Sequence, residues 1–169
     1  MAFQIKAMNE RNARIIAGWK YPPPYDFYNL DDNPEAIAEL LETDYYTIFS
    51  EEDNLLGYYC LGAAAQVPAG HQYDAYTTDD PTIDIGIGLR PDLTGKGFGY
   101  EFFSIVLDAV KKAHPHAAVR LTVAICNKRA IRLYENCGFV KAVEFASPRA
   151  QFMTMMLAAP VHYAHSSCT

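Results

Sequence analysis

The chain has 169 residues, half of them apolar, and a formal net charge of −6 at pH 7. This length suits one hydrophobic core better than two, so we expect a single domain over residues 1–169. The acidic balance argues against a nucleic-acid partner, since such binding rests on clustered Lys and Arg. No run approaches the roughly 20 apolar residues that span a bilayer, and the amino terminus has no signal-like apolar stretch, so we expect a cytoplasmic protein with no membrane partner.

The first part of the chain predicts two short helices. Asn9 can cap the first, and the prolines after Tyr21 must end it. Asn33 and Pro34 begin the second, which ends near Thr43. The apolar side chains predicted to face inward are Ile15, Ile16 and Trp19 in the first helix, and Ile37, Leu40 and Leu41 in the second.

A hairpin and a long loop are expected next. Two strand-like runs, residues 45–49 and 55–61, are joined by a polar turn, which predicts a β-hairpin. The segment 66–81 is polar and is punctuated by Pro68 and Gly70, so we expect a long mobile loop there. Loops of this kind often contact substrate.

The segment 82–113 predicts a strand, a turn and a helix. Residues 82–89 carry Ile or Leu at alternate positions and Asp84, Gly86 and Gly88 between them, which predicts a strand with room beside one face. The apolar residues from Phe98 onwards then recur at the spacing of an amphipathic helix.

The last part of the chain predicts three strands and one helix. The strand 119–125 follows a crossover helix, so it should lie parallel to the strand before that helix. A helix over 128–136 closes at Gly138, which suits a left-handed cap. Two apolar runs then form an antiparallel pair, and the tail after Pro160 is expected to be frayed. These runs are 139–145 and 151–157.

The cysteines favour neither a metal centre nor a disulfide framework. They form no C-x-x-C pair and no Cys/His ligand spacing, so we expect reduced thiols and no metal. They are Cys60, Cys126, Cys137 and Cys168.

A glycine-rich turn, residues 89–99, joins the strand to the strong helix. The first turn of a helix has free amide donors and partial positive charge, and glycine lets an anion approach the backbone. The turn therefore suits a pyrophosphate. Lys96 is followed by glycine, which does not fit a P-loop, and Tyr100 breaks the spacing of a Rossmann fingerprint. The alternative is that the glycines only shape a turn.

Two motifs resemble the signatures of the GNAT superfamily of N-acetyltransferases. The first is Leu89, Pro91, Thr94, Gly97 and Gly99, which resembles the family's coenzyme-binding loop. The second, downstream, is Asn127, Ala130, Ile131, Leu133, Tyr134, Gly138 and Phe139. The resemblance covers about residues 82–140, the coenzyme-binding core. One departure is Thr94, which stands where the family usually has Gln or Arg.

The resemblance implies an α/β (α+β) fold and an activity. The expected sheet is mixed and GNAT-like, with about six to seven strands, mostly antiparallel around a splayed parallel central pair, and about four flanking helices. The implied activity is acetyl transfer from acetyl-CoA, as co-substrate, to a primary amine on a small molecule or peptide. A catalytically silent CoA-binding module with the same fold is the alternative. Monomer and homodimer, and the acyl chain length, stay open.

The resemblance also implies where the coenzyme lies. Its pantetheine arm would run along the first parallel strand, and its pyrophosphate would lie on the turn and the first helical residues. Asn127 would contact the arm, and Tyr134 would face the sulfur and assist the departing thiolate; the two share a helix face because they are seven residues apart. The residues expected to bind coenzyme are Ile87, Gly88, Leu89, Thr94, Gly95, Lys96, Gly97, Phe98, Gly99, Tyr100, Asn127 and Ala130.

An alkylammonium acceptor must lose a proton before it attacks, so a base or a water chain is expected. Asp84 is the leading candidate, because it lies on the coenzyme strand beside Gly86 and Gly88. The alternatives for Asp84 are a structural role, as a cap or in a pair, and an electrostatic contact with the amine. Acceptor contacts are sought in two segments, at Tyr25 and Tyr28 and at His71, Tyr73 and Asp74.

Overall fold

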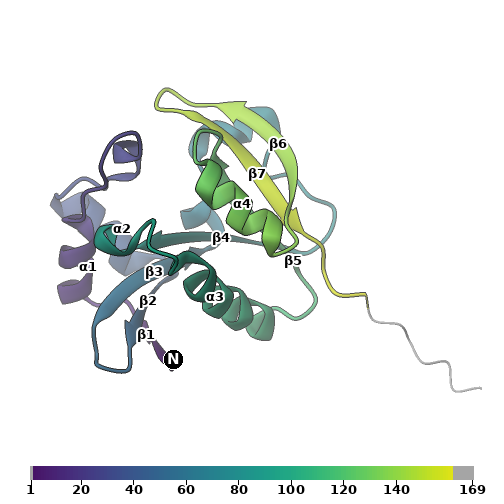
Figure 1. Cartoon of the computed structure of the whole chain (residues 1–169). Coiled ribbons are helices and arrows are strands. Elements are labelled where there is room, and N and C mark those ends of the chain that lie inside the picture. The colour runs from purple at the N-terminus through teal and green to yellow at the C-terminus, as the bar shows by residue number, and fades with distance from the viewer. Residues whose placement is uncertain (1, 162–169) are drawn as a thin grey trace, which may run out of the picture.

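A computed structural model describes residues 2–161 (Figure 1). One seven-stranded mixed sheet runs in the order β1-β2-β3-β4-β5-β7-β6, and β4 and β5 are its parallel neighbours. The strands are β1 (Phe3–Ala7), β2 (Tyr45–Ser50), β3 (Leu55–Leu61), β4 (Thr82–Leu89), β5 (Ala118–Ala124), β6 (Val140–Ala146) and β7 (Gln151–Leu157). The α-helices are α1 (Glu10–Ala17), α2 (Pro34–Glu42), α3 (Gly99–Ala113) and α4 (Lys128–Asn136).

The expected mixed sheet is confirmed, and local chemistry explains several element ends. The side chains of Asn9 and Asn33 accept hydrogen bonds from the backbone N–H groups of Asn12 and Ala36, so each caps a helix as the sequence predicts. Gly138, after α4, has a φ of 95°, the left-handed conformation that glycine adopts without strain.

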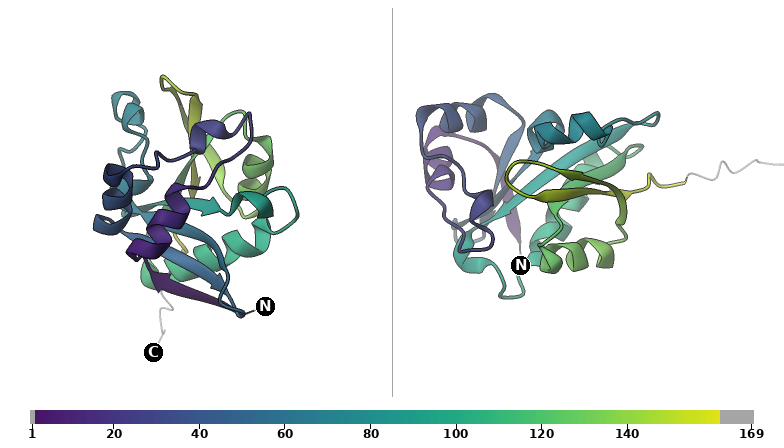
Figure 2. Two further views of the ribbon diagram at one scale, coloured as in Figure 1. Left: turned by 90° about the vertical axis from the view of Figure 1, so that its left-hand side faces the viewer. Right: turned by 90° about the horizontal axis from the view of Figure 1, so that it is seen from above.

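Three apolar clusters hold the layers together. The largest lies between the sheet and α3 and α4, and it includes Ile85, Phe103 and Tyr134. On the opposite face, α1 and α2 pack with Tyr58 near one end of the sheet. Near the other end of that face, Tyr76 packs against residues of β5, β6 and β7. Figure 2 (right) shows α4 (green) on one side of the sheet and the short 3₁₀ helices that follow β3 on the other.

Two predictions of inward-facing residues in the first helices are wrong. Ile15 and Leu41 are 44% and 42% exposed, whereas Ile16 and Leu40 are buried. The helices α1 and α2 are short, and each buries only one narrow stripe of its surface. Some of their apolar residues therefore lie outside that stripe and stay exposed.

The segment 66–81 also differs from the expected loop. It contains the 3₁₀ helix η3 (Pro68–Tyr73), and Ala75 and Tyr76 are buried. The Tyr76 hydroxyl bonds to Thr122 of β5, and it accepts a bond from the Val67 N–H. The segment is therefore folded onto the sheet by a buried aromatic residue that its polar composition conceals.

The predicted parallel pair is splayed. Its pairing runs from Thr82 and Ala118 to Ile85 and Leu121 and then stops, while β4 continues along β3 and β5 continues along β7. A gap therefore opens between the carboxyl ends of β4 and β5. Within residues 2–161, none of the helices is both long and apolar enough to cross a membrane. The prediction of a frayed tail falls mainly on residues 162–169, which lie outside the described part.

Candidate functional site

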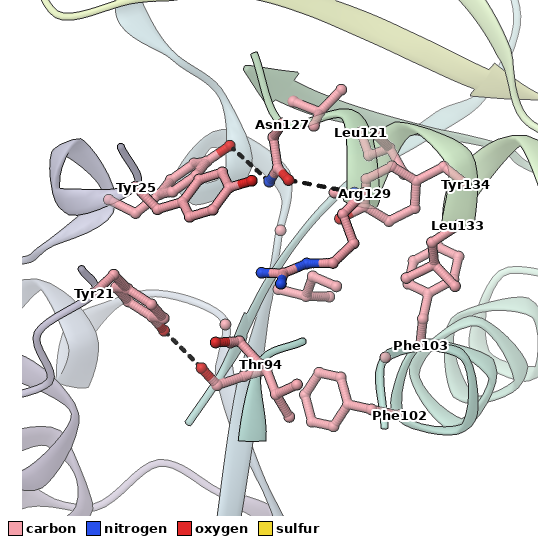
Figure 3. A pocket seen from close by; sticks show the side chains of 18 of the residues that line it. Tyr21, Tyr25, Thr94, Phe102, Phe103, Leu121, Asn127, Arg129, Leu133 and Tyr134 are labelled. Atoms are coloured by element: carbon pink, nitrogen blue, oxygen red, sulfur yellow. Dashed lines mark hydrogen bonds between the residues drawn. The ribbon is translucent and has the colours of Figure 1, made fainter. Parts of the chain in front are cut away.

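A cavity of about 490 Å³ lies at the gap between β4 and β5. The glycine turn forms one part of its wall, and α3 and α4 form another with Phe103, Leu133 and Tyr134. The opposite wall comes from the segment between α1 and α2, with Tyr21 and Tyr25 (Figure 3). The cavity is therefore lined from both faces of the sheet, through the gap.

The turn has the backbone geometry that an anion site requires. Gly95 and Gly97 have φ values of 71° and 85°. The first hydrogen bond of α3 runs from the Phe102 N–H to the Phe98 carbonyl, so the helix ladder does not use the amides just before Phe102. The predicted residues of the turn that line the cavity are Thr94, Gly95, Gly97, Gly99 and Tyr100.

Other predicted features of the turn lie elsewhere. Lys96 and Phe98 are outside the cavity lining, and the Phe98 side chain, 39% exposed, lines a separate depression that Phe3 and Leu56 also line. The Thr94 hydroxyl donates to the Pro91 carbonyl at 2.7 Å. Thr94 therefore stabilises the turn.

The end of β4 offers its backbone to the cavity. The Tyr21 hydroxyl donates to the Leu89 carbonyl at 2.8 Å from the gap side, and the Arg90 N–H donates to Leu56 of β3. Backbone groups of successive residues in a strand point to alternate sides, so Ile87 and Leu89 face the gap and Gly88 faces β3. This edge has lost its β5 partner, and it is where the pantetheine arm was predicted.

The glycine face of β4 is not open, contrary to the expected room beside it. A Cβ on Gly88 would lie 2.2 Å from the Tyr58 ring, and one on Gly86 would lie 2.9 Å from the Cys60 sulfur. Glycine is required there because neighbouring side chains already fill the space. Burial raises the pKa of the Cys60 thiol to about 12, so this thiol stays protonated.

The structure brings the predicted residues of α4 to the cavity. Asn127, Ala130 and Tyr134 all line it. Asn127 is also the N-cap of α4, because its side-chain oxygen accepts from the Ala130 N–H at 3.3 Å. Its amide nitrogen donates to the Tyr28 hydroxyl at 3.4 Å. Figure 3 marks both bonds of this amide.

Tyr134 packs its ring in the core and turns its hydroxyl to the cavity. The ring meets Phe103 edge to face, with centroids 4.9 Å apart, and the residue is 7% exposed. Its hydroxyl bonds to no other side chain or backbone group within residues 2–161, yet no buried polar side-chain atom of that part is left without a partner. The hydroxyl is therefore accessible from the cavity. Burial, then the nearby Tyr28 and Cys137, raises the pKa of Tyr134 well above that of a free phenol.

Asp84 lies away from the cavity lining, in the structural role that was its alternative. Its carboxylate forms a two-point ion pair with Arg120 of β5, at 2.6 and 2.8 Å, and accepts from the Gln66 side chain at 2.9 Å. Asp84 and Arg120 are 5% and 4% exposed. Both carboxylate oxygens therefore already accept hydrogen bonds from Arg120 or Gln66. Asp84 alternates with Ile85, which faces α3, so it points to the opposite face.

Of the acceptor candidates, Tyr25 and Tyr28 line the cavity. The rings of His71 and Tyr73 instead pack at a tilt against those of Tyr76 and Phe145, respectively, outside the cavity lining. Asp74, with a φ of 54°, ends η3 and is likewise not in the lining.

Arg129 is the functional candidate that the sequence reasoning missed. Its guanidinium lies 5.5 Å from the centre of the Tyr25 ring, and a Cβ on Gly95 would come within 2.5 Å of it. It therefore brings a positive charge to the glycine turn. The available signal was its place in the first turn of the helix that Asn127 caps.

Comparison with known proteins places this geometry in a family. The model of the acetyltransferase (GNAT) family matches residues 9–139. None of the curated proteins compared with the chain matches it. Among solved structures, a chimera of the spermidine N-acetyltransferase SpeG from Vibrio cholerae and hSSAT is similar, with a TM-score of 0.68, 20% identity, and coverage of 94% of this chain and 96% of that one.

A second similar structure has the same architecture. The aminoglycoside acetyltransferase AAC(6')-Ib in complex with coenzyme A has a TM-score of 0.70 and 17% identity, and the match covers 93% of this chain and 95% of that one. At such identities the likeness concerns the fold. The splayed strands, the glycine turn and the family match together show that this chain belongs to the GNAT family of acetyltransferases.

Proposed function

We propose that the chain is an N-acetyltransferase that moves an acetyl group from acetyl-CoA to a primary amine on a small molecule or peptide. The observation that carries the proposal is the Tyr134 hydroxyl, which opens to a cavity bounded by the glycine turn and by two splayed strands. The amine attacks directly, and Tyr134 assists the thiolate that leaves.

The residues present fit coenzyme A. The amides of the turn and the Arg129 guanidinium would hold its diphosphate, since both supply positive charge around Gly95. The gap-facing edge at Ile87 and Leu89 would take the amide groups of the arm in place of the missing strand. Bound there, acetyl-CoA supplies an electrophilic thioester carbonyl and a thiol leaving group.

Tyr134 acts as a hydrogen-bond donor. Its raised pKa keeps the phenol protonated throughout the neutral range. Donation to the sulfur becomes stronger as negative charge develops there, and a donor aimed at developing charge in a water-poor site lowers the barrier. Full proton transfer is not required of a phenol whose pKa lies above that of a thiol.

The amine has to lose its own proton. For an amine with a pKa near 10.4 this costs about 4.6 kcal/mol at pH 7. Within residues 2–161, the cavity lining contains no carboxylate and no imidazole. We infer that the acceptor enters along the wall that carries Tyr21 and Tyr25, opposite the helices, and releases its proton to water.

The test is turnover with a panel of amines. Spermidine, an aminoglycoside, an aromatic monoamine and a peptide are each incubated with acetyl-CoA, and thiol release is followed. We expect release with at least one acceptor. Tyr134→Phe should lower kcat by about 100-fold, while the Kd of acetyl-CoA measured by calorimetry changes little. Tyr73→Phe, an exposed tyrosine outside the cavity, is the matched control.

Two results would contradict the proposal. If acetyl-CoA fails to bind the folded protein, the donor site is wrong. If it binds tightly but no acceptor leads to thiol release, the chain is a silent CoA-binding module with the same fold.

A further inference from the structure

The orientation of the Asn127 side-chain amide is fixed by its capping role. Its oxygen accepts from the Ala130 N–H at the start of α4, so the amide cannot be turned round without losing the cap. The NH₂ group must then face Tyr28, 3.4 Å away. Tyr28 is therefore the acceptor in that contact.

A second donor meets the same phenol oxygen. The backbone N–H of Ala124, on the gap side at the end of β5, donates to the Tyr28 hydroxyl at 3.3 Å. A phenol has one proton and an oxygen that accepts. Two N–H groups already point at this oxygen, so its own proton must be directed away from both. The Tyr28 hydroxyl donates to no other group within residues 2–161, and Tyr28 lines the cavity.

Tyr28 and Tyr134 both line the cavity and lie within electrostatic range of each other. Asn127, which holds Tyr28, shares one face of α4 with Tyr134 and lies seven positions before it. The charge of an ionised Tyr28 would raise the pKa of Tyr134, so the two phenols interact. Burial also raises the pKa of Tyr28. Both groups keep their protons at neutral pH, and both have a proton to donate.

We propose that Tyr28 is a second catalytic hydrogen-bond donor, which binds the thioester carbonyl oxygen while Tyr134 binds the sulfur. The inference rests on the proposed function. As the amine nitrogen bonds to the carbonyl carbon, the π pair of the C=O bond moves to oxygen, and the nitrogen then loses a proton to water. The pair on oxygen re-forms the C=O bond as the C–S bond breaks and its pair leaves on sulfur as the thiolate. Negative charge thus develops on two atoms in turn, and one phenol serves each. Tyr28 keeps its proton throughout.

The first test removes the donor. Tyr28→Phe should lower kcat by about 100-fold, the size expected for one such donor, with the Kd of acetyl-CoA little changed. A readout independent of turnover is the infrared band of a carbonyl-labelled acetyl-CoA bound to the enzyme. In the wild type its frequency should be lower than in Tyr28→Phe, because a hydrogen bond weakens the C=O bond.

The second test keeps the Tyr28 ring but directs its hydroxyl proton away from the substrate. In Asn127→Asp the carboxylate still caps α4, but its other oxygen accepts from Tyr28 instead of donating to it. This variant should lose most of its kcat and its carbonyl shift, and Asn127→Asp should have a much smaller effect in the Tyr28→Phe background. A purely structural Tyr28 predicts equal effects of Asn127→Asp in both backgrounds. Thermal melting would show whether α4 is kept.

The outcomes separate this inference from the proposed function. An active wild type with unchanged kcat and carbonyl band in Tyr28→Phe overturns the role of Tyr28 alone. A wild type that binds acetyl-CoA but transfers to no acceptor overturns the proposed function and, with it, this role.

Discussion

The two halves of the β4–β5 pair differ in how their backbone and their charges are satisfied. In the first half the strands pair, and the cross-strand partners Asp84 and Arg120 form a buried ion pair. In the second half the pairing has ended, and tyrosine hydroxyls reach the free edges. The Tyr21 hydroxyl donates to Leu89 of β4, and the Tyr28 hydroxyl accepts from β5.

The difference teaches which half is structural and which can respond to a ligand. A strand ladder and a buried ion pair leave few groups for another molecule, so the first half closes the sheet. Hydroxyl contacts satisfy one backbone group at a time, and neighbouring groups such as Ile87 stay available. The same two strands thus provide both the anchor and the opening.

We call the first half, where the strands pair, the closed half, and the second the open half. The largest expected effect comes from breaking the ion pair in the closed half. Arg120→Ala should lower the free energy of unfolding by about 3–5 kcal/mol, because it leaves the Asp84 carboxylate buried with only Gln66 as a partner. Urea denaturation measures the change. The matched variant replaces both charges, Asp84→Leu with Arg120→Met, and should lose much less.

Asp84 of this ion pair is also the residue that the sequence suggested as the catalytic base. Asp84→Asn should reduce stability while the kcat of the folded protein changes little. A folded Asp84→Asn protein with normal acetyl-CoA binding and no turnover would mean that Asp84 acts in catalysis. This result would contradict the division into a structural and a ligand-binding half.

A smaller effect is expected from the glycine turn in the open half. Gly97 has a positive φ and open space around the position of a Cβ, so alanine would cost about 1–2 kcal/mol in backbone strain alone. If the turn relaxes to relieve this strain, its amides shift, and the Kd of acetyl-CoA should rise roughly tenfold, equivalent to about 1.4 kcal/mol. Calorimetry measures the change.

Gly62 provides the control for this prediction. It also has a positive φ and nothing near the position of a Cβ, but it lies in η2 (Gly62–Ala65), outside the cavity lining. Gly62→Ala should lose similar stability without changing the Kd of acetyl-CoA. Equal losses of affinity in both variants would mean that the turn binds no diphosphate.

The elements that surround the open half were predicted well from the sequence. The bounds of β4 and α4 agree with the predictions because alternation and a terminal glycine are local signals. The splay followed from the family resemblance. Ten of the predicted coenzyme residues lie in the cavity lining, and Lys96 and Phe98 do not. Their contact with coenzyme remains a prediction.

The closed half was harder to predict because its key contacts are distant in sequence. Arg120 follows Asp84 by 36 positions, and only the strand register makes them partners. Tyr76 is buried from a polar segment because it meets Thr122. Tyr28 bonds to Ala124 and Asn127, which lie almost a hundred positions away. The sequence therefore indicated its segment as an acceptor-contact region but could not predict these bonds.

The smallest expected effect concerns pH. The enzyme itself should add no titrating group to the pH profile of kcat/KM. Burial raises the pKa values of Tyr28 and Tyr134, so both phenols stay protonated below the ordinary phenol pKa of about 10 and neither titrates between pH 6 and 9. With water as the proton acceptor, kcat/KM should rise with pH only as the acceptor amine deprotonates. An acceptor of lower amine pKa should move the whole profile to lower pH by the difference between the two amines. A limb that keeps its pKa when the acceptor is changed would identify a base on the protein, and the open half would then hold a titrating group outside the tyrosine-lined wall.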